Sequence, residues 1–325
     1  SRFKVLKTEA NLNNELGVPL TIFRIEPEHD VAVIEMGISH FQEMTRLAQM
    51  AQPDIGIFTV IGYAHLENLG SREGILWAKT EMVKYMQPDG VMIVNGDDDK
   101  LCTLKNRTDL DCTTFGMDAS NDVYAKSVEN LGMEGLKCEF STPAGDFSAH
   151  IHIPGMHMVY NALAGTCVGL ACGLTLEEIK SGIENAQTIS GRNNIIHTDN
   201  YTIMDDCYNA NPQSMAGAVK ILANAGEMKK IAMLGDMKEL GENSDSMHRR
   251  IGSYLKSDLV QLAHHGQQAV KREFYEFMCG IGDFMPKNER LGPFCTEVER
   301  ERVEIGDIVQ LSNMQGRFYH SLLVS

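Results

Sequence analysis

Short apolar segments recur along the chain, and most of them end in a glycine or a polar residue before a helical pattern begins. In the first half the clearest are VAVIEMG (31–37), IGIFTVIG (55–62) and VMIVNGDD (91–98). Runs of this kind are typical of strands that are buried on both faces of a parallel sheet. Amphipathic stretches such as 71–86 and 157–173 follow them. The alternation predicts an α/β fold.

The same pattern returns in the second half of the chain. The apolar runs there are YTIMDD (201–206), KKIAMLGD (229–236), LVQLAHHG (259–266) and GDIVQL (306–311). The segment 110–153 differs, because its residues alternate without a long helix, and it predicts a small antiparallel addition to the first sheet. A helical pattern ends just before 187–191, where we place a boundary. We therefore expect two domains, residues 1–188 and 189–325.

Composition and charge narrow the class of protein. The 44 acidic and 29 basic residues give a formal net charge of -15, which argues against a nucleic-acid or anionic-membrane surface. The eight cysteines show no CxxC pair and no zinc-site spacing. No apolar stretch reaches the ~18 residues of a membrane helix, and no signal-peptide core opens the chain. We expect a cytoplasmic protein with free thiols, without membrane insertion or nucleic-acid partners.

Polar residues at the ends of the predicted strands are the first candidates for chemistry, since ligands of open parallel sheets bind there. Glu35 ends one apolar run and His65 follows the next. Asn95 and Asp97 follow a third run, and Lys79 lies on the helix after His65. A carboxylate and an imidazole at neighbouring strand ends can share a divalent cation that holds phosphate oxygens. Alternatively, Glu35 caps a helix, His65 is an ordinary loop residue and Lys79 is solvated.

Two polar segments in the second half also follow predicted strands. They are DDCYNANPQSM (205–215) and GDMKELGENS (235–244). Adjacent polar loops of this kind can form a concave site for a polar ligand, and they can equally be ordinary connections between strands and helices. No GxxxxGK followed by Ser or Thr, the loop that cradles ATP phosphates, occurs in the 325 residues.

Seven motifs taken together resemble the Mur ligase family. They are KTEANLNNELGVPLTI (7–22), VIEMG (33–37), IGYAHLENLGSREGILWAKTE (61–81), HMVYNALAG (157–165), SGRNN (190–194), DDCYNANPQSM (205–215) and LGDMKELGENS (234–244). The resemblance implies a UDP-sugar domain, a central ATPase domain and a C-terminal Rossmann-like α/β domain. We expect the chain to begin inside the central domain, after its phosphate-binding loop. Residues 1–188 would then be an incomplete ATPase-type domain with a mostly parallel sheet, and 189–325 the Rossmann-like domain.

The family resemblance also implies an activity. In such enzymes ATP phosphorylates a terminal carboxylate, and an amine attacks the acyl phosphate to form an amide. The motifs are most similar to members that add D-alanyl-D-alanine to UDP-N-acetylmuramoyl tripeptide in peptidoglycan synthesis. ATP and Mg²⁺ are the implied cofactors, and a monomer is expected. The alternative is a non-catalytic remnant that serves as a nucleotide- and dipeptide-binding or scaffolding module. Without a phosphate-binding loop, these 325 residues alone are expected to lack ligase turnover.

Matching the motifs residue by residue implies a catalytic set in the first domain. Glu35 and His65 would be metal ligands. Lys79 would be a carbamylated lysine whose anionic carbamate helps to hold a second Mg²⁺. Asn161, in HMVYNALAG, would face the adenine of ATP.

The second domain would supply further contacts. Arg192 would reach the ATP phosphates, and Asp206 would contact the ribose or phosphate side of the nucleotide. Tyr208, Asn209 and Asn211 would help to form the wall that faces the dipeptide and the nucleotide. A guanidinium suits the role given to Arg192, because it binds phosphate oxygens in a fork.

The chain departs from the family pattern at three places. Val60 stands where the family commonly has Asn, which puts one polar contact near the metal site in doubt. Ala10 replaces a usual Gly. The segment LSNMQGRF (311–318) lacks the lysine often seen after the last strand, so no site residue is assigned there.

Overall fold

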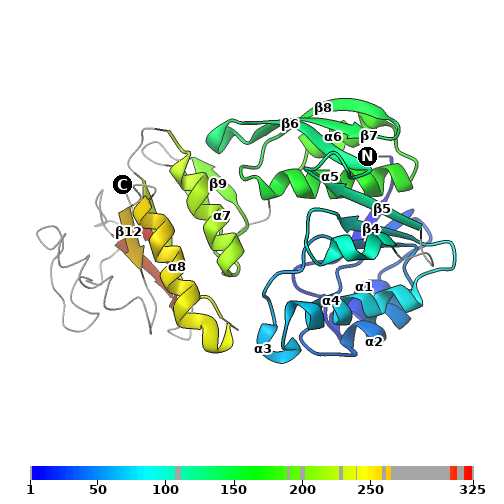
Figure 1. Cartoon of the computed structure of the whole chain (residues 1–325), viewed down its shortest axis with the longest axis horizontal. Helices are drawn as coiled ribbons and strands as arrows, with labels where there is room; N and C mark the ends of the chain where they lie inside the picture. Colours follow the sequence, from blue (N-terminus) through cyan, green and yellow to red (C-terminus); the bar gives the residue numbers. More distant parts are fainter. Residues whose placement is uncertain are drawn as a thin grey trace, which may run out of the picture. The chain divides into compact units, whose positions relative to one another are not determined.

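The computed structural model describes most of the chain, in two compact units (Figure 1). The units are Ser1–Gln187 with Glu239–Gly241, and Thr188–Lys238 with Glu242–Ser325. Residues 189 and 190 of the expected boundary, and much of the expected strands after residue 258, lie outside the described residues. The described ranges are 2–106, 111–188, 191–197, 202–226, 230–238, 240–257, 261–264, 308–312 and 318–323.

A six-stranded mixed sheet forms the centre of the first unit. Its order is β3-β4-β5-β6-β7-β8, parallel from β3 to β6 and antiparallel from β6 to β8. The antiparallel strands β6 to β8 confirm the antiparallel addition predicted within 110–153. The strand β5 lies in the same segment but pairs in parallel with β4, so it extends the parallel part of the sheet. The strands are β3 (Ile55–Phe58), β4 (Val91–Asn95), β5 (Asp111–Gly116), β6 (Val123–Asn130), β7 (Leu136–Thr142) and β8 (Gly145–Ile151).

Helices cover both faces of this sheet, with α5 on one side of β4 and β5 and α1, α2 and α4 on the other (Figure 1). Side chains of β4 therefore alternate between two cores. Ile93 joins the cluster under α5, whereas Met92 and Val94 join the cluster under α2 and α4. This alternation explains why the strand reads as a continuous apolar run. The helices are α1 (Gly17–Ile22), α2 (Glu43–Ala51), α3 (Leu66–Leu69), α4 (Arg72–Thr80), α5 (His157–Ala171) and α6 (Leu176–Glu184), with 3₁₀ turns η1 (Glu81–Tyr85), η2 (Leu101–Asn106) and η3 (Gly132–Glu134).

Local sequence signals start two of these helices. The Ser71 hydroxyl accepts from the Gly74 N–H at 3.0 Å and caps α4, and Thr175 forms a capping box with Glu178 at the start of α6. The stretch 71–86 begins as predicted, but α4 ends at Thr80 and continues as the tighter turn η1.

One predicted strand differs from expectation. We expected 31–37 to be buried on both faces, but β2 (Val31–Val33) has only three residues, and Val33 is 53% exposed. The reason is its pairing. Among the described residues β2 pairs only with β1 (Val5–Lys7), in parallel, and β3 pairs only with β4. Both β2 and β3 thus keep one edge without a described strand, and the apolar Ile57 of β3 is 39% exposed.

The second unit contains three described strand pairs. These are β9 (Asn194–His197) with β10 (Thr202–Asp205), β11 (Ile231–Leu234) with β12 (Gln261–His264), and β13 (Ile308–Ser312) with β14 (Phe318–Leu323). The segment 201–206 was expected in a parallel sheet, yet β10 runs antiparallel to β9. Only four residues separate the two strands, and a parallel pair needs a crossover of about a dozen.

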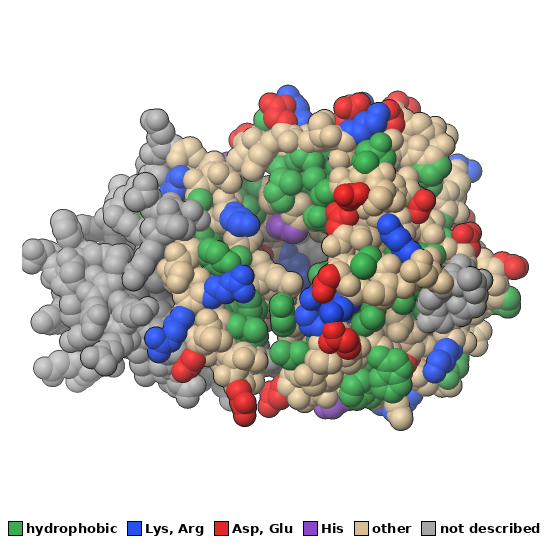
Figure 2. Space-filling view, viewed as in Figure 1, with side chains coloured by type: hydrophobic (Ala, Val, Ile, Leu, Met, Phe, Trp, Pro, Cys, Tyr) green, Lys and Arg blue, Asp and Glu red, His purple; other side chains and the backbone are tan. Residues whose placement is uncertain are grey.

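Two helices accompany these strands, α7 (Pro212–Ala223) and α8 (Ser244–Ser257), with the short turn η4 (Gly241–Asn243) before α8. Val219 of α7 packs with Ala232 of β11 in a small core. None of the described helices has both the length and the apolar character needed to cross a bilayer. On the face in Figure 2, acidic and basic side chains are interspersed over the described surface.

Candidate active site

Glu35 lies just beyond the carboxyl end of β2 and is held from two directions. Its N–H donates to Thr8 Oγ1 at 2.9 Å, and its Oε1 accepts from Asn13 Nδ2 at 2.9 Å. Thr8 and Asn13 follow β1, and parallel pairing brings the ends of β1 and β2 to the same edge. The carboxylate is therefore exposed to solvent but fixed in position.

Gly37 lets the loop after Glu35 approach Asn13. The Gly37 N–H donates to the Asn13 carbonyl at 2.7 Å. A Cβ at position 37 would lie 2.9 Å from Asn13 Nδ2, the same nitrogen that donates to Glu35. The sequence analysis gave Thr8 and Asn13 no role, although both lie in the quoted segment 7–22 directly after an apolar strand.

Lys79 lies near Glu35 and is half-buried on α4. Removal from water lowers the pKa of Lys79, and the negative charge of Glu35 opposes that shift. The interpretation of Lys79 as an ordinary solvated lysine is therefore not favoured here. Glu35 after β2 and Lys79 on α4 are distant in sequence but lie close enough in the first unit for their charges to interact.

His65 precedes α3 and has a left-handed backbone, with φ at 60°. Its carbonyl accepts from the N–H groups of Asn68 at 3.1 Å and Leu69 at 3.0 Å. The side chain is half-buried. Glu35 follows the carboxyl end of β2 and His65 follows that of β3, but these two strands pair in separate sheets of the described residues, so their neighbourhood stays a prediction.

The loop that carries His65 is anchored by residues that the sequence analysis did not single out. Arg72 Nε donates to the Ile61 carbonyl at 2.9 Å, and its Nη1 donates to Asp99 at 3.0 Å. The Ile61 N–H donates to Asp98 Oδ2 at 2.9 Å. Arg72 stands in the GSREG motif, but its partners become visible only in the folded chain.

Asn95 and Asp97 have structural roles. Asn95 Nδ2 donates to the Thr59 carbonyl at 3.0 Å, which ties β4 to the loop after β3. Asp97 accepts from Asn121 Nδ2 at 2.9 Å and from the Tyr160 hydroxyl at 3.1 Å. Loss of water and the Asp97 carboxylate raise the pKa of Tyr160 to about 12. These two strand-end residues hold loops together.

Asn161 follows Tyr160 on α5, and its side chain is exposed. Its Nδ2 donates to Met158 Sδ at 3.3 Å, a weak acceptor. Its amide therefore remains accessible at the surface of the first unit.

The donor set determines whether a cation fits the first unit. No group of three or more His, Cys, Asp or Glu side chains suited to a metal ion is found within the described ranges. Glu35 and His65 supply two such side chains. A carbamate on Lys79 would add hard oxygen donors beside Glu35, of the kind that Mg²⁺ prefers. The described side chains alone therefore form no cation site, and a site at Glu35 would need the additional oxygen donors of such a carbamate.

In the second unit, two loops from the motifs SGRNN and DDCYNANP are joined by hydrogen bonds. The Gly191 N–H donates to Asp205 Oδ2 at 2.9 Å, and the Asn193 N–H donates to Asp206 Oδ1 at 3.1 Å. The Tyr208 N–H donates to the Gly191 carbonyl at 3.0 Å. Asp206 thus helps to fix the conformation of the loop that carries the SGRNN motif.

Arg192 sits between these contacts. Its guanidinium carbon lies 4.3 Å from the centre of the Tyr208 ring, a cation–π stack. Both side chains are exposed, so the guanidinium is oriented and remains accessible. The structure therefore brings Arg192, Asp206 and Tyr208 together within one unit.

Asn209 and Asn211 have local backbone contacts. Asn209 Oδ1 accepts from the Ala210 N–H at 2.9 Å. Asn211 Oδ1 accepts from the N–H groups of Gln213 at 3.0 Å and Ser214 at 2.9 Å, and caps α7. The oxygen of Asn211 therefore stabilises the helix start, which leaves its amide nitrogen as the group for other contacts.

The fold and these motifs define the class of protein. Residues 1–169 match the description "Mur ligase middle domain", and residues 191–277 match "Mur ligase, glutamate ligase domain". Because the first match alone covers more than half of the chain, the chain belongs to the Mur ligase family. The α/β architecture with a mostly parallel central sheet agrees with this family.

Relatives with one name resemble the chain over most of its length. The UDP-N-acetylmuramoyl-tripeptide--D-alanyl-D-alanine ligase of Escherichia coli (strain K12) is 33% identical over 254 residues, which are 78% of this chain and 56% of the relative. The enzyme of that name from Bacillus subtilis (strain 168) is 34% identical over 262 residues, 80% of this chain and 56% of the relative. The chain thus spans little more than half the length of these relatives.

A solved structure has a similar fold. The crystal structure of MurF from Acinetobacter baumannii superposes with a TM-score of 0.75 at 31% sequence identity. The match covers 86% of this chain and 65% of that chain. The similarity therefore includes parts of both units.

Proposed function

We propose that a protein containing these two units joins D-alanyl-D-alanine to UDP-N-acetylmuramoyl tripeptide at the expense of ATP, as a cytoplasmic monomer in peptidoglycan synthesis. Residues 1–188 would be the ATP-binding middle domain and 189–325 the C-terminal ligase domain. The observation that carries the proposal is the half-buried Lys79 beside the fixed carboxylate of Glu35. The similarity to ligases of that name supports the choice of substrates.

Lys79 has the environment that carbamylation needs. Carbon dioxide reacts with a neutral amine, and the burial that lowers the pKa of Lys79 favours the neutral form. A bond forms between Nζ and the carbon of CO₂, one proton leaves to solvent, and an anionic carbamate results. The carbamate, Glu35 and His65 would then hold Mg²⁺, which neutralises phosphate charge when it is bound.

The remaining site residues would bind the nucleotide and the dipeptide. Asn161 would contact the adenine through its exposed amide. Arg192 would bind phosphate oxygens, with Tyr208 orienting its guanidinium and Asp206 holding its loop. Asn209 and Asn211 would line the dipeptide side of the same segment.

The proposal is tested with the native protein that contains these residues. It is supplied with ATP, Mg²⁺, the UDP-sugar tripeptide and D-alanyl-D-alanine, and the pentapeptide product and ADP are measured. We expect product from the wild-type protein and a loss of at least about 100-fold for Lys79→Ala. Added propionate should restore part of that activity by supplying the missing carboxylate.

Lys180→Ala, on α6, is the matched control and should leave turnover unchanged. Nucleotide binding without any product would favour the non-catalytic binding module instead. Full activity of Lys79→Ala would contradict the role given to this lysine.

A further inference from the structure

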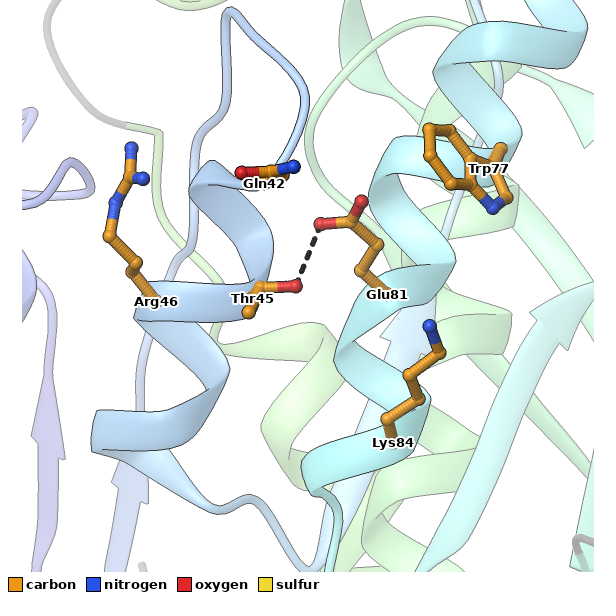
Figure 3. Close-up of a pocket in the computed structure, with 6 residues that line it drawn as sticks. All are labelled: Gln42, Thr45, Arg46, Trp77, Glu81 and Lys84. Atoms are coloured by element: carbon orange, nitrogen blue, oxygen red, sulfur yellow. Dashed lines mark hydrogen bonds between the residues drawn. The ribbon is translucent and has the colours of Figure 1, made fainter.

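A pocket with several charged side chains in its lining lies in the first unit, between α2 and the segment formed by α4 and η1 (Figure 3). Its volume is about 330 Å³. Trp77, Glu81 and Lys84 follow one another at spacings of four and three residues, so they share one face, whereas Lys79 points to the other side. The pocket is therefore separate from the Glu35 and Lys79 pair. It is lined by Gln42, Thr45, Arg46, Trp77, Glu81 and Lys84.

Glu81 is the unusual member of this pocket. Its side chain belongs to a residue that is only 5% exposed, and Thr45 Oγ1 donates to its Oε2 at 2.9 Å. Among the described residues the carboxylate of Glu81 accepts no other hydrogen bond and forms no ion pair. Figure 3 shows its second oxygen turned away from Thr45, towards the space near Gln42 and Trp77. A buried carboxylate with one neutral donor is costly unless a cation joins it.

Trp77 provides a surface that suits such a cation. It is 57% exposed, and the neighbouring Phe41 ring supports it at a centroid distance of 5.1 Å. An ammonium group next to an indole gains cation–π attraction, which adds to its attraction to a nearby carboxylate. Trp77 and Glu81 both line the pocket, so an ammonium group bound there would meet the indole and the carboxylate.

Lys84 adds a positive charge at the same pocket. It is exposed and forms no ion pair with any described residue. Arg46, the other cation, is already paired with Glu15. A simple cation would be repelled by Lys84, and a simple anion would be repelled by Glu81. The pocket therefore matches a ligand with one charge of each sign.

We propose that this pocket binds a small zwitterion of the α-amino-acid class. Its ammonium group would lie between Glu81 and Trp77, and its carboxylate would pair with Lys84. The volume is at the lower end of that of ligand pockets, which suits a single amino acid. This binding site is independent of the ligase activity proposed above.

Trp77 makes the proposal directly measurable, because it is the only tryptophan of the chain. The chain is titrated with alanine, with N-acetylalanine, which lacks the ammonium group, and with alaninamide, which lacks the carboxylate. We expect a saturable change in fluorescence with alanine and binding at least about tenfold weaker with the other two. Calorimetry repeats the titrations without relying on fluorescence.

Two variants test the assigned groups. Glu81→Gln keeps the volume and an acceptor for Thr45 but removes the charge, and Lys84→Met removes the other charge. Each should weaken alanine binding at least about tenfold, with unchanged circular dichroism. The same substitutions at exposed positions away from the pocket, Glu177→Gln and Lys137→Met, should bind as the wild type does. Absence of saturable alanine binding, equal binding of the three probes, or full binding by Glu81→Gln would overturn the proposal.

Discussion

Cys207 lies between the candidate site residues Asp206 and Tyr208, and loss of water around its sulfur together with Asp205 suppresses its reactive thiolate form. Loss of water around the sulfur is the main cause that raises the pKa of Cys207 to about 12, followed by the hydrogen bond and the charge of Asp205. The Sγ–H donates to Asp205 Oδ1 at 2.7 Å. The residue is exposed, so access does not limit its reactivity. The thiolate required for alkylation is scarce at neutral pH.

We predict that iodoacetamide alkylates Cys207 at pH 8 at least about 100-fold more slowly than it alkylates a free thiol. The rate should rise as pH increases towards 12, because the raised pKa delays formation of the thiolate. Asp205→Asn should increase the rate at pH 8. Mass spectrometry of the peptide that contains Cys207 provides the rate, and reaction at the rate of free cysteine would refute the assignment.

Tyr160 provides a prediction about stability and pH. Its pKa rises from 10.0 to about 12 in the folded chain, so folding favours the neutral phenol. The resulting contribution of Tyr160 to the free energy of unfolding is fully present below pH 10 and is lost as pH rises through 12. Tyr160→Phe should lower the free energy of unfolding by about 1 kcal/mol at pH 8, since it removes the hydrogen bond to Asp97.

Urea unfolding of the wild type and Tyr160→Phe at several pH values measures the free energy of unfolding of both proteins. The difference in free energy of unfolding between the two proteins should be constant from pH 7 to pH 9 and should shrink above pH 10. A difference that grows with pH would show that the hydroxyl is not held in its neutral form.

The loop between β2 and α2 depends on the absence of a side chain at Gly37. A Cβ there would meet Asn13 Nδ2 at 2.9 Å and displace the amide that holds Glu35. We predict that Gly37→Ala lowers the free energy of unfolding by about 1–3 kcal/mol. The matched control is Gly165→Ala on α5, where a Cβ meets nothing within 4 Å and the better helix former should stabilise by up to about 1 kcal/mol. Chemical denaturation measures the free energy of unfolding of both variants, and an equal change in the two would refute the prediction.

Secondary structure was predictable where local pattern and burial agree. The run 91–98 contains β4, whose side chains alternate between two cores and are apolar up to its last residue, Asn95. The run 31–37 has the same apolar character, yet β2 is short and exposed because burial depends on neighbouring strands that the run itself does not specify. Likewise β10 pairs antiparallel with β9, which an apolar run alone cannot indicate.

The candidate site residues could be proposed from the sequence, whereas the residues that hold them in place could not. Glu35 and Lys79 were assigned from strand-end position and family motifs, and the structure brings them together. Thr8, Asn13 and Arg72 were missed, because their role consists of contacts between segments distant in sequence. Ala10 was noted in place of a usual Gly, and its φ of 48° shows the backbone conformation for which glycine is normally preferred.

Across the whole chain, the two units carry complementary parts of the proposed chemistry. In the proposal, Glu35, His65 and Lys79 of the first unit would hold a cation, and Arg192 of the second would bind phosphate oxygens. The pocket at Glu81 would add a separate ligand to the first unit.

The direct test of this arrangement is ¹³C nuclear magnetic resonance of the protein in ¹³C-bicarbonate with Mg²⁺. If burial beside Glu35 makes Lys79 the site of carbamylation, the spectrum should contain one carbamate carbon signal that disappears in Lys79→Arg and persists in the control Lys180→Arg. A spectrum without a carbamate signal, or a signal that survives Lys79→Arg, would contradict the assignment of this lysine and of the cation site built around it.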